Sequence, residues 1–217
     1  MKREVAVLPC VAVLLLGSIG CSRKAKPTLV PAQNVEMDDK TLMKFAEEVV
    51  EYVELRKKAM TNVPPVNEKA TADELTKRQE VLTRTIVAYR KGAKQGDIFK
   101  KDVEAAIRRI LTREFTGPNG AALMKDIKEG NPKVEGNPQP QNPTREVKQT
   151  VNVAVNAIYT DGAPFSTVPG SLLLKLPLLP DEVRYRFVGR ALIIRDTEAN
   201  LILDYILDVV PDPTTPR

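Results

Sequence analysis

The sequence contains no histidine and no tryptophan, and only two of its 217 residues are cysteine. Histidine is the commonest general base and metal ligand, so its absence excludes Ser-His and Cys-His catalytic pairs and ordinary zinc sites. None of the serines lies in a Gly-x-Ser-x-Gly elbow, and no phosphate-cradling glycine pattern occurs. We therefore expect a protein that is not an enzyme and that needs no cofactor.

Aromatic residues make up 5% of the chain, and its net charge is +5. Much of the basic excess lies in residues 1–36, so that the part from Met37 onward has a net charge of +2. That balance is too even for a nucleic-acid footprint, and few side chains are available to stack on bases. We expect no nucleic-acid partner.

Carboxylate pairs are the remaining candidates for catalysis, because glycoside hydrolysis uses two of them. Three adjacent pairs occur, which we interpret as a helix cap, an exposed helix face and a turn: Asp38-Asp39, Glu47-Glu48 and Asp181-Glu182. No EF-hand-like acidic loop occurs. A hydrolase that uses carboxylates and a magnesium or calcium site made of carboxylates alone are left open.

The N-terminus has the layout of an export signal. Lys2 and Arg3 precede an apolar run over residues 5–16, which is shorter than the roughly 20 residues of a spanning helix. The small residues Gly17, Ser18 and Gly20 follow. Cys21 comes next, and this order resembles the lipobox of bacterial lipoproteins, in which the signal is cut before a cysteine that then carries the lipid. We expect residues 1–20 to be a signal peptide and Cys21 the site of lipid attachment.

Two other fates of this segment are left open. Ser18-Ile19-Gly20 also fits ordinary signal cleavage, which would give a secreted soluble protein, and an uncleaved anchor is the third alternative. Cys10 leaves with the signal, so Cys21 is the single cysteine of the mature chain and has no disulfide partner. Acylation would remove a thiol that is a liability in an oxidising compartment. We expect a cell-envelope lipoprotein facing the periplasm or the exterior, at an inner or an outer membrane.

Composition divides the mature chain into four sections. Residues 21–36 are polar and proline-spaced, and we interpret them as a flexible tether whose basic residues suit an anionic membrane surface. Residues 37–129 have helical periodicity. Residues 130–144 contain three Asn-Pro pairs and are expected to be a linker, and residues 145–217 are rich in strand patterns.

Three helices are predicted by apolar residues at three- and four-residue steps. The first follows Asp38 as N-cap and ends before Val63, and the second starts at a capping box of Thr71 and Glu74 and ends near Gly92. The inward faces of these two helices are predicted to be Leu42, Phe45, Val49 and Val53, and then Leu75, Leu82, Ile86 and Tyr89. The basic segments 56–58 and 108–109 are interpreted as exposed faces.

The third helix follows the sequence "GDIF" and ends at Gly117. Its inward face is predicted to contain Val103, Ile107, Ile110 or Leu111, and Phe115. A short fourth helix is expected over residues 121–128.

After residue 144 the periodicity changes to two. Residues 147–159 predict one long strand with an apolar face, and Pro169 marks the first turn of a short helix after Thr167. "VRYRFV", "ALIIRD" and "LILDYIL" predict three strands of an antiparallel meander, with a helix over residues 198–209 as the alternative to the third. The expected fold class is α+β.

Six charged residues of this meander form the candidate partner-binding set: Arg184, Arg186, Arg190, Arg195, Asp196 and Asp204. The arginines are predicted to share one face, either as an exposed polar surface or as a docking surface for an anionic polymer such as envelope polysaccharide. We expect Asp196 to start a turn and Asp204 to face solvent. Binding of a cation or of a partner's basic group is the alternative role for both aspartates.

Two stretches carry a resemblance to known proteins: "GDIF" and "YRFVGRALIIRDTEANLILDYI". Together with the export signal they resemble an uncharacterised family of predicted exported bacterial lipoproteins, which implies no known activity. The second stretch is also similar to the small β-module of periplasmic nickel/cobalt homeostasis proteins of the Rcn type. The positions that match this module are Tyr185, Phe187, Val188, Gly189, Leu192, Asp196 and Ile206. This second resemblance implies a β-module, and it hardly supports metal handling in a chain without histidine.

These observations favour a non-enzymatic envelope lipoprotein that binds a protein or polymer partner. A periplasmic accessory protein that handles a metal or another ligand is the alternative.

Overall fold

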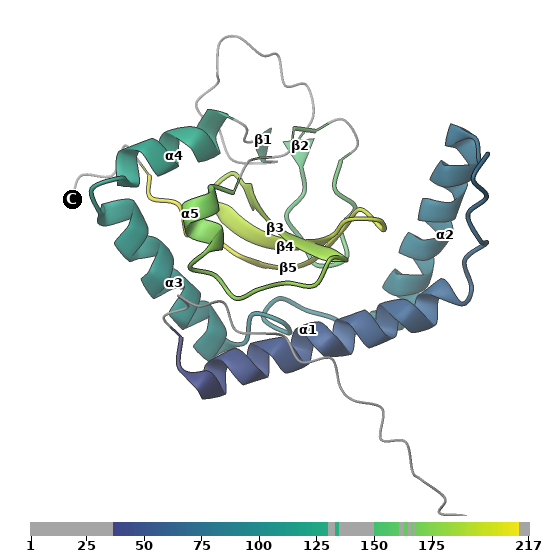
Figure 1. The fold of residues 1–217 in the computed structure, drawn as a ribbon, viewed down its shortest axis with the longest axis horizontal. Helices are drawn as coiled ribbons and strands as arrows, with labels where there is room; N and C mark the ends of the chain where they lie inside the picture. Colours follow the sequence, from purple (N-terminus) through teal and green to yellow (C-terminus); the bar gives the residue numbers. More distant parts are fainter. Residues whose placement is uncertain are drawn as a thin grey trace, which may run out of the picture.

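The computed structural model describes residues 37–129, 133–134, 150–160, 163–164, 166 and 168–212. Cys21, the export signal, the predicted tether and most of the predicted linker lie outside these residues. The fold is α+β, as predicted: helices occupy the N-terminal half, and a short helix and a three-stranded antiparallel sheet follow (Figure 1).

Four helices form the first part: α1 (Asp39–Met60), α2 (Ala72–Tyr89), α3 (Lys101–Thr116) and α4 (Gly120–Glu129). The predicted starts of α1 and α2 are confirmed, since the Asp38 side chain accepts a hydrogen bond from the Thr41 amide at 2.9 Å and the capping box of Thr71 and Glu74 is formed. In Figure 1, α1 runs along one side of the sheet, and α3 with α4 stands at one end of α1 and α2 at the other.

The predicted inward faces of α1 and α3 are largely correct. Phe45, Val49 and Val53 of α1 are buried, and α3 buries both Ile110 and Leu111. The prediction for α2 is wrong at two positions, because Leu75 is 47% and Tyr89 42% exposed. The N-terminal half of α2 projects away from the body, which leaves Leu75 exposed (Figure 1). Tyr89 is the last residue of the helix, and its hydroxyl accepts a hydrogen bond from Asn62 Nδ2 at 3.1 Å on the surface.

The sheet contains the three predicted strands, β3 (Val183–Val188), β4 (Ala191–Asp196) and β5 (Leu201–Ile206), in the order β3-β4-β5. The alternative of a helix over residues 198–209 is therefore wrong. Gly189 connects β3 to β4 with φ +60, a left-handed conformation that glycine adopts without strain. The short helix α5 (Gly170–Leu173) precedes the sheet and follows Pro169, as predicted.

The predicted long strand over residues 147–159 is wrong for the described residues 150–159. Only β2 (Thr150–Val151) is a strand there, paired in parallel with β1 (Lys133–Val134) inside the predicted linker. Asn156 has φ +62, a left-handed conformation that ends an extended run. The segment instead covers the edge of β5, with hydrogen bonds from the Asn156 amide to the Ile202 carbonyl and from the Ile202 amide to the Ala157 carbonyl, both 2.9 Å long.

Both faces of the sheet are covered, and all six residues of β4 are buried. The main core lies on the helical side, where Phe45 stacks on Phe99 and Phe115 meets Phe187 edge-on. A smaller core on the opposite side contains Val151, Tyr159, Ala163, Val188, Ile193 and Ile202. Helices from the first half and strands from the second therefore share one continuous core.

Candidate functional site

Two candidate aspartates of the sheet, Asp196 and Asp204, have no exposed surface at all. The prediction that Asp204 faces solvent is wrong, and a bulge explains why. The register between β4 and β5 shifts at Ile194 and Arg195, which leaves Leu203 as an extra residue of β5. Alternation changes phase at such a bulge. Asp204 therefore turns towards the helices, the side on which Leu203 also packs.

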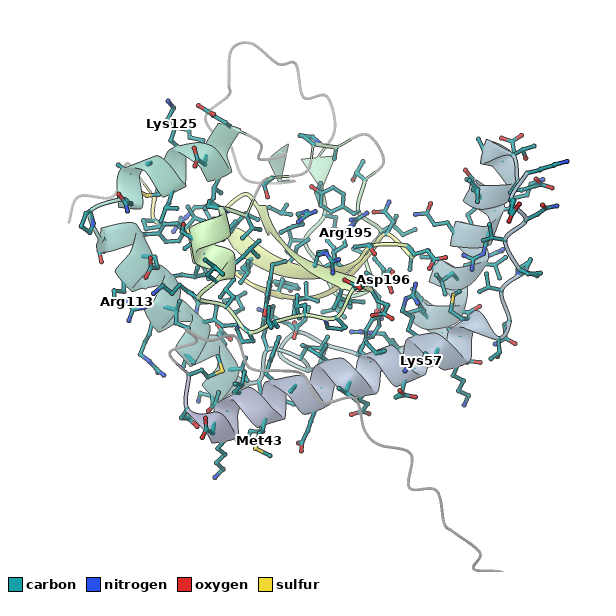
Figure 2. All side chains as sticks on the ribbon, viewed as in Figure 1. Met43, Lys57, Arg113, Lys125, Arg195 and Asp196 are labelled. Carbon is teal, nitrogen blue, oxygen red and sulfur yellow. The ribbon has the colours of Figure 1, made fainter. Side chains whose placement is uncertain are left out.

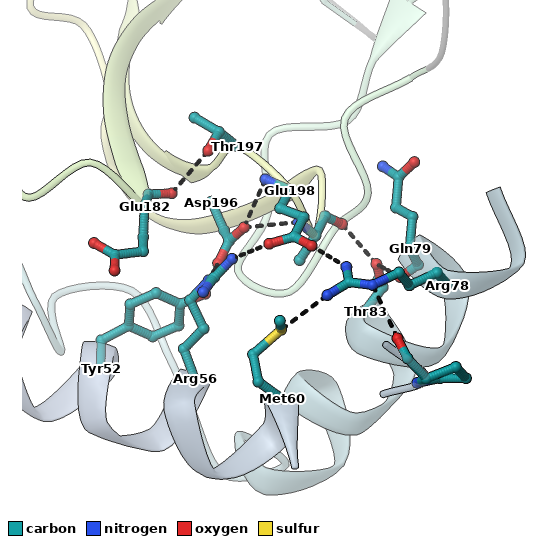
Figure 3. Close-up of polar contacts among 12 residues, drawn as sticks. Tyr52, Arg56, Met60, Arg78, Gln79, Thr83, Glu182, Asp196, Thr197 and Glu198 are labelled. Atoms are coloured by element: carbon teal, nitrogen blue, oxygen red, sulfur yellow. Dashed lines mark hydrogen bonds and ion pairs between the residues drawn. The ribbon is translucent and has the colours of Figure 1, made fainter. Parts of the chain in front are cut away.

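Asp196 lies at the end of β4 and accepts four hydrogen bonds (Figure 3). From α1, the Tyr52 hydroxyl donates at 2.6 Å and Arg56 Nε at 2.9 Å, both to Oδ2. The backbone amides of Glu198 and Ala199 donate to Oδ1 at 2.9 and 2.7 Å, as expected of an aspartate that starts a turn. The carboxylate thus joins a turn to a helix 140 residues away in the sequence.

Glu198 extends this contact to a second helix. One of its carboxylate oxygens pairs with Arg56 of α1 and the other with Arg78 of α2 (Figure 3). Thr83 Oγ1 of α2 also donates to the Ala199 carbonyl at 2.6 Å. We call Tyr52, Arg56, Arg78, Asp196 and Glu198 the turn clamp, because together they hold the β4–β5 turn against α1 and α2.

The surroundings of Tyr52 and Arg56 keep both side chains protonated. Burial and the neighbouring charge of Asp196 raise the pKa of Tyr52 far above its usual value, so the hydroxyl stays a donor. Burial lowers the pKa of Arg56, but the carboxylates of Asp196 and Glu198 outweigh this effect and raise it overall. Burial lowers the pKa of Arg90, whose guanidinium lies 5.2 Å from the centre of the Tyr52 ring.

Asp204 binds the loop that precedes α3. Its Oδ1 accepts a hydrogen bond from the Gly96 amide at 3.0 Å, and its Oδ2 accepts from the amides of Ile98 and Phe99 at 2.9 and 2.8 Å. Gly96 has φ +86, which suits glycine and lets the amides of residues 96, 98 and 99 point at one carboxylate. The two stretches that carry the family resemblance, "GDIF" and the β4–β5 region, therefore contact each other here.

The predicted arginine face is only partly exposed. Arg184 lies opposite Arg195 in the strand register, and its Nη2 pairs with Asp181 at 3.1 Å. Arg186 is half-buried, burial lowers its pKa, and its Nη1 donates to the Tyr185 carbonyl at 2.9 Å.

Arg195 is 7% exposed, which contradicts an open surface at this position. Its Nε and Nη2 donate to Asn200 Oδ1 at 3.0 and 2.6 Å, and its guanidinium lies 5.3 Å from the centre of the Tyr159 ring. The physical reason is the smaller core, which covers this side of β4. Arg190 donates to the Val210 carbonyl at 2.9 Å and lies 3.4 Å from Asp208.

Sequence reasoning missed the helical half of the turn clamp. The basic segment 56–58 was expected to be exposed, but Arg56 is 8% exposed. The sequence does contain a signal for the burial of Arg56. Positions 45, 49, 52 and 56 follow one another at three- and four-residue steps and therefore share one face of the helix. An arginine on a buried stripe needs a carboxylate partner, and Asp196 is a candidate because it interrupts an apolar strand pattern.

One surface groove of about 620 Å³ lies between α1 and the start of α3. It is lined by three lysines and three acidic residues: Lys44, Lys100, Lys101, Glu47, Glu48 and Asp102. Lys44 pairs with Asp102, and Lys100 lies 3.4 Å from Glu48. The groove therefore offers alternating charges that are partly open to solvent.

No protein-family model, no curated protein and no solved structure matches this chain. The resemblances drawn from the sequence stay predictions. Within the described ranges, no group of three or more potential metal ligands of the His, Cys, Asp and Glu type comes together. None of the helices that the structure describes is long and apolar enough to cross a bilayer. Asp196 accepts four hydrogen bonds, and so does Asp204 once the bond from the Tyr205 amide at 2.8 Å is included, so both carboxylates have a structural role.

Proposed function

We propose that this protein is a non-enzymatic lipoprotein of the bacterial cell envelope, anchored through acyl chains on Cys21 and binding a protein or polymer partner. The observation that carries the proposal is Cys21 itself, the single cysteine after an export-type signal. Fifteen residues separate Cys21 from Met37, the first described residue. A chain of this length spans at most about 50 Å when fully extended, which is enough to hold the folded part clear of a membrane.

Two structural observations support a binding role. Asp196 and Asp204, the best oxygen ligands for the metal-handling alternative, are fully buried and engaged by the protein's own donors. The groove between α1 and α3 instead presents three lysines and three carboxylates on a helical framework. Alternating charges of this kind suit a partner segment that carries both signs, and they favour specificity over raw affinity.

Membrane fractionation tests the anchor. The native gene is expressed in its own host with Cys21→Ala, and Ser22→Ala serves as the neighbouring control. The parent and the Ser22→Ala protein are expected in the membrane fraction and in the detergent phase. Cys21→Ala should accumulate unprocessed. Membrane attachment and processing that persist in Cys21→Ala would contradict the proposal.

Site-resolved crosslinking tests the partner surface. A photoreactive residue replaces Lys101 in the groove, and the matched control replaces Lys125, whose side chain on α4 is 75% exposed. Irradiation of intact envelopes should give one defined adduct from position 101 and none from position 125. Identical patterns from both positions, or no adduct from 101, would contradict a partner in the groove.

A further inference from the structure

Three leucines project from the segment that leads into the sheet. Leu173 is 43%, Leu174 64% and Leu178 48% exposed, although they lie within six residues of one another. We call these three side chains the leucine ridge. Single exposed apolar residues are common on protein surfaces and need no explanation, whereas three exposed leucines in one short segment are a candidate interaction site.

The backbone under the leucine ridge is fixed in place. Leu172 and Leu176, which lie in the same segment as the exposed leucines, have no exposed surface. The Tyr185 hydroxyl donates a hydrogen bond to the Pro177 carbonyl at 3.1 Å, and Arg184 Nη1 donates to the Pro180 carbonyl at 3.0 Å. The outward direction of the ridge is thus set by the core and by β3.

The segment that carries the ridge contains no acidic residue, and the exposed Asp181 that follows it is paired with Arg184 at 3.1 Å. Residues 162–180 include no aspartate or glutamate, and Lys175 is their only charged residue. Lys175 lies between Leu174 and the buried Leu176. A lysine beside exposed leucines is the arrangement found where a protein lies on a lipid surface, since the apolar side chains enter the interface and the ammonium stays at the head groups.

The size of the ridge separates a lipid surface from a second protein. A stable protein interface buries about 800 Å² on each partner, and three half-covered leucines fall well short of that area. A weak apolar contact is sufficient for docking when the protein is already held at the lipid surface, because a tether raises the effective concentration of the leucine ridge at that surface. The chain between Cys21 and Met37 would act in this way.

We propose that the leucine ridge docks into the interface of the membrane that holds the acylated Cys21, and so fixes which side of the folded part faces the lipid. The inference rests on the proposed function. In Figure 1, α5 lies at the end of the sheet that is distant from α2, so this docking would leave α2 directed away from the ridge.

The experiment uses two features of the sequence. The chain has no tryptophan, so a single tryptophan is a unique fluorophore, and Cys21 is the only cysteine after the signal. The chain 21–217 is coupled through Cys21 to maleimide-bearing lipid in vesicles of phosphatidylethanolamine and phosphatidylglycerol. One variant carries Leu174→Trp. The control carries Met43→Trp, because Met43 is also 64% exposed and points outward from α1 (Figure 2).

We expect the emission of Leu174→Trp to shift to shorter wavelength and to be quenched by brominated lipid, and that of Met43→Trp to do neither. Adding Leu178→Ser to Leu174→Trp should weaken the contact about tenfold, because one buried leucine is lost. Equal quenching of both tryptophans, no quenching at position 174, or a blue shift there without quenching would overturn the proposal. The last result would indicate contact with another protein chain. Because the anchor is chemical, these outcomes do not depend on whether cells acylate Cys21.

Discussion

Arg56 of α1 and Asp196 of β4 form a buried ion pair, with 2.9 Å between Nε and Oδ2. The side chains are 10% and 0% exposed. This pair links the helical half of the protein to the sheet, and Tyr52, Arg78 and Glu198 complete the contact. The turn clamp therefore adds a polar contact to the apolar core that the two halves share.

Replacing Arg56 tests the turn clamp. Arg56→Ala leaves Asp196 as a buried carboxylate without its charged partner, and removing one member of such a pair costs about 3–5 kcal/mol. Urea unfolding should show this loss of stability. Lys57→Ala, at a neighbouring position that is 57% exposed, should change stability by less than about 0.5 kcal/mol. A loss of stability in Arg56→Ala no larger than that in Lys57→Ala would show that the ion pair does not stabilise the contact between α1 and the sheet.

Replacing Asp204 tests the structural role of its carboxylate. Asp204→Asn keeps one acceptor oxygen but turns an amide towards the donors of the "GDIF" loop, and we expect a loss of about 3 kcal/mol. Hydrogen exchange at the amides of Gly96, Ile98 and Phe99 should become faster. Asp208→Asn, at a side chain that is 67% exposed, should leave both properties close to those of the parent chain. Unchanged exchange at these three amides in Asp204→Asn would contradict the assignment.

The fold class, the four helices and the three strands follow from periodicity, because apolar spacing and capping residues are local properties. The position of Asp204 does not follow, since a one-residue bulge reverses which side of β5 it faces. The pairing of Arg56 with Asp196 also escapes a linear pattern, because it joins residues 140 positions apart. The predicted strand over residues 147–159 failed for a related reason: its alternation is real, but Asn156 turns the chain along the edge of β5.

Alkaline pH should destabilise the fold. Burial raises the pKa of Tyr52 and of Tyr185, so the folded protein retains phenolic protons that the unfolded chain releases above about pH 10. Their contribution to stability is fully present below that pH and falls above it by about 1.4 kcal/mol per pH unit for each tyrosine. Tyr52→Phe should lower the free energy of unfolding at neutral pH, because Asp196 loses a hydrogen-bond donor. Above about pH 10 the free energy of unfolding of this variant should fall less steeply with pH than that of the parent chain, by about 1.4 kcal/mol per pH unit. Urea unfolding at several pH values measures both effects, and an unchanged slope would refute the role of Tyr52.

The shared core predicts how the protein behaves after cleavage of the predicted linker. With a protease site inserted between residues 136 and 141, the cleaved chain should elute in size-exclusion chromatography as one species. Helices and strands continue to share contacts such as that between Phe115 and Phe187. The fragments should separate only in denaturant. Separation under native conditions would indicate two independent domains.

The intact mass of the protein purified from the membranes of its own host tests the central claim most directly. An envelope lipoprotein should have the mass of residues 21–217 plus a glycerol-linked pair of acyl chains on Cys21, with or without a third chain on the new amino terminus, and it should partition into detergent. The unmodified mass of residues 21–217, recovered from the aqueous phase, would contradict the account.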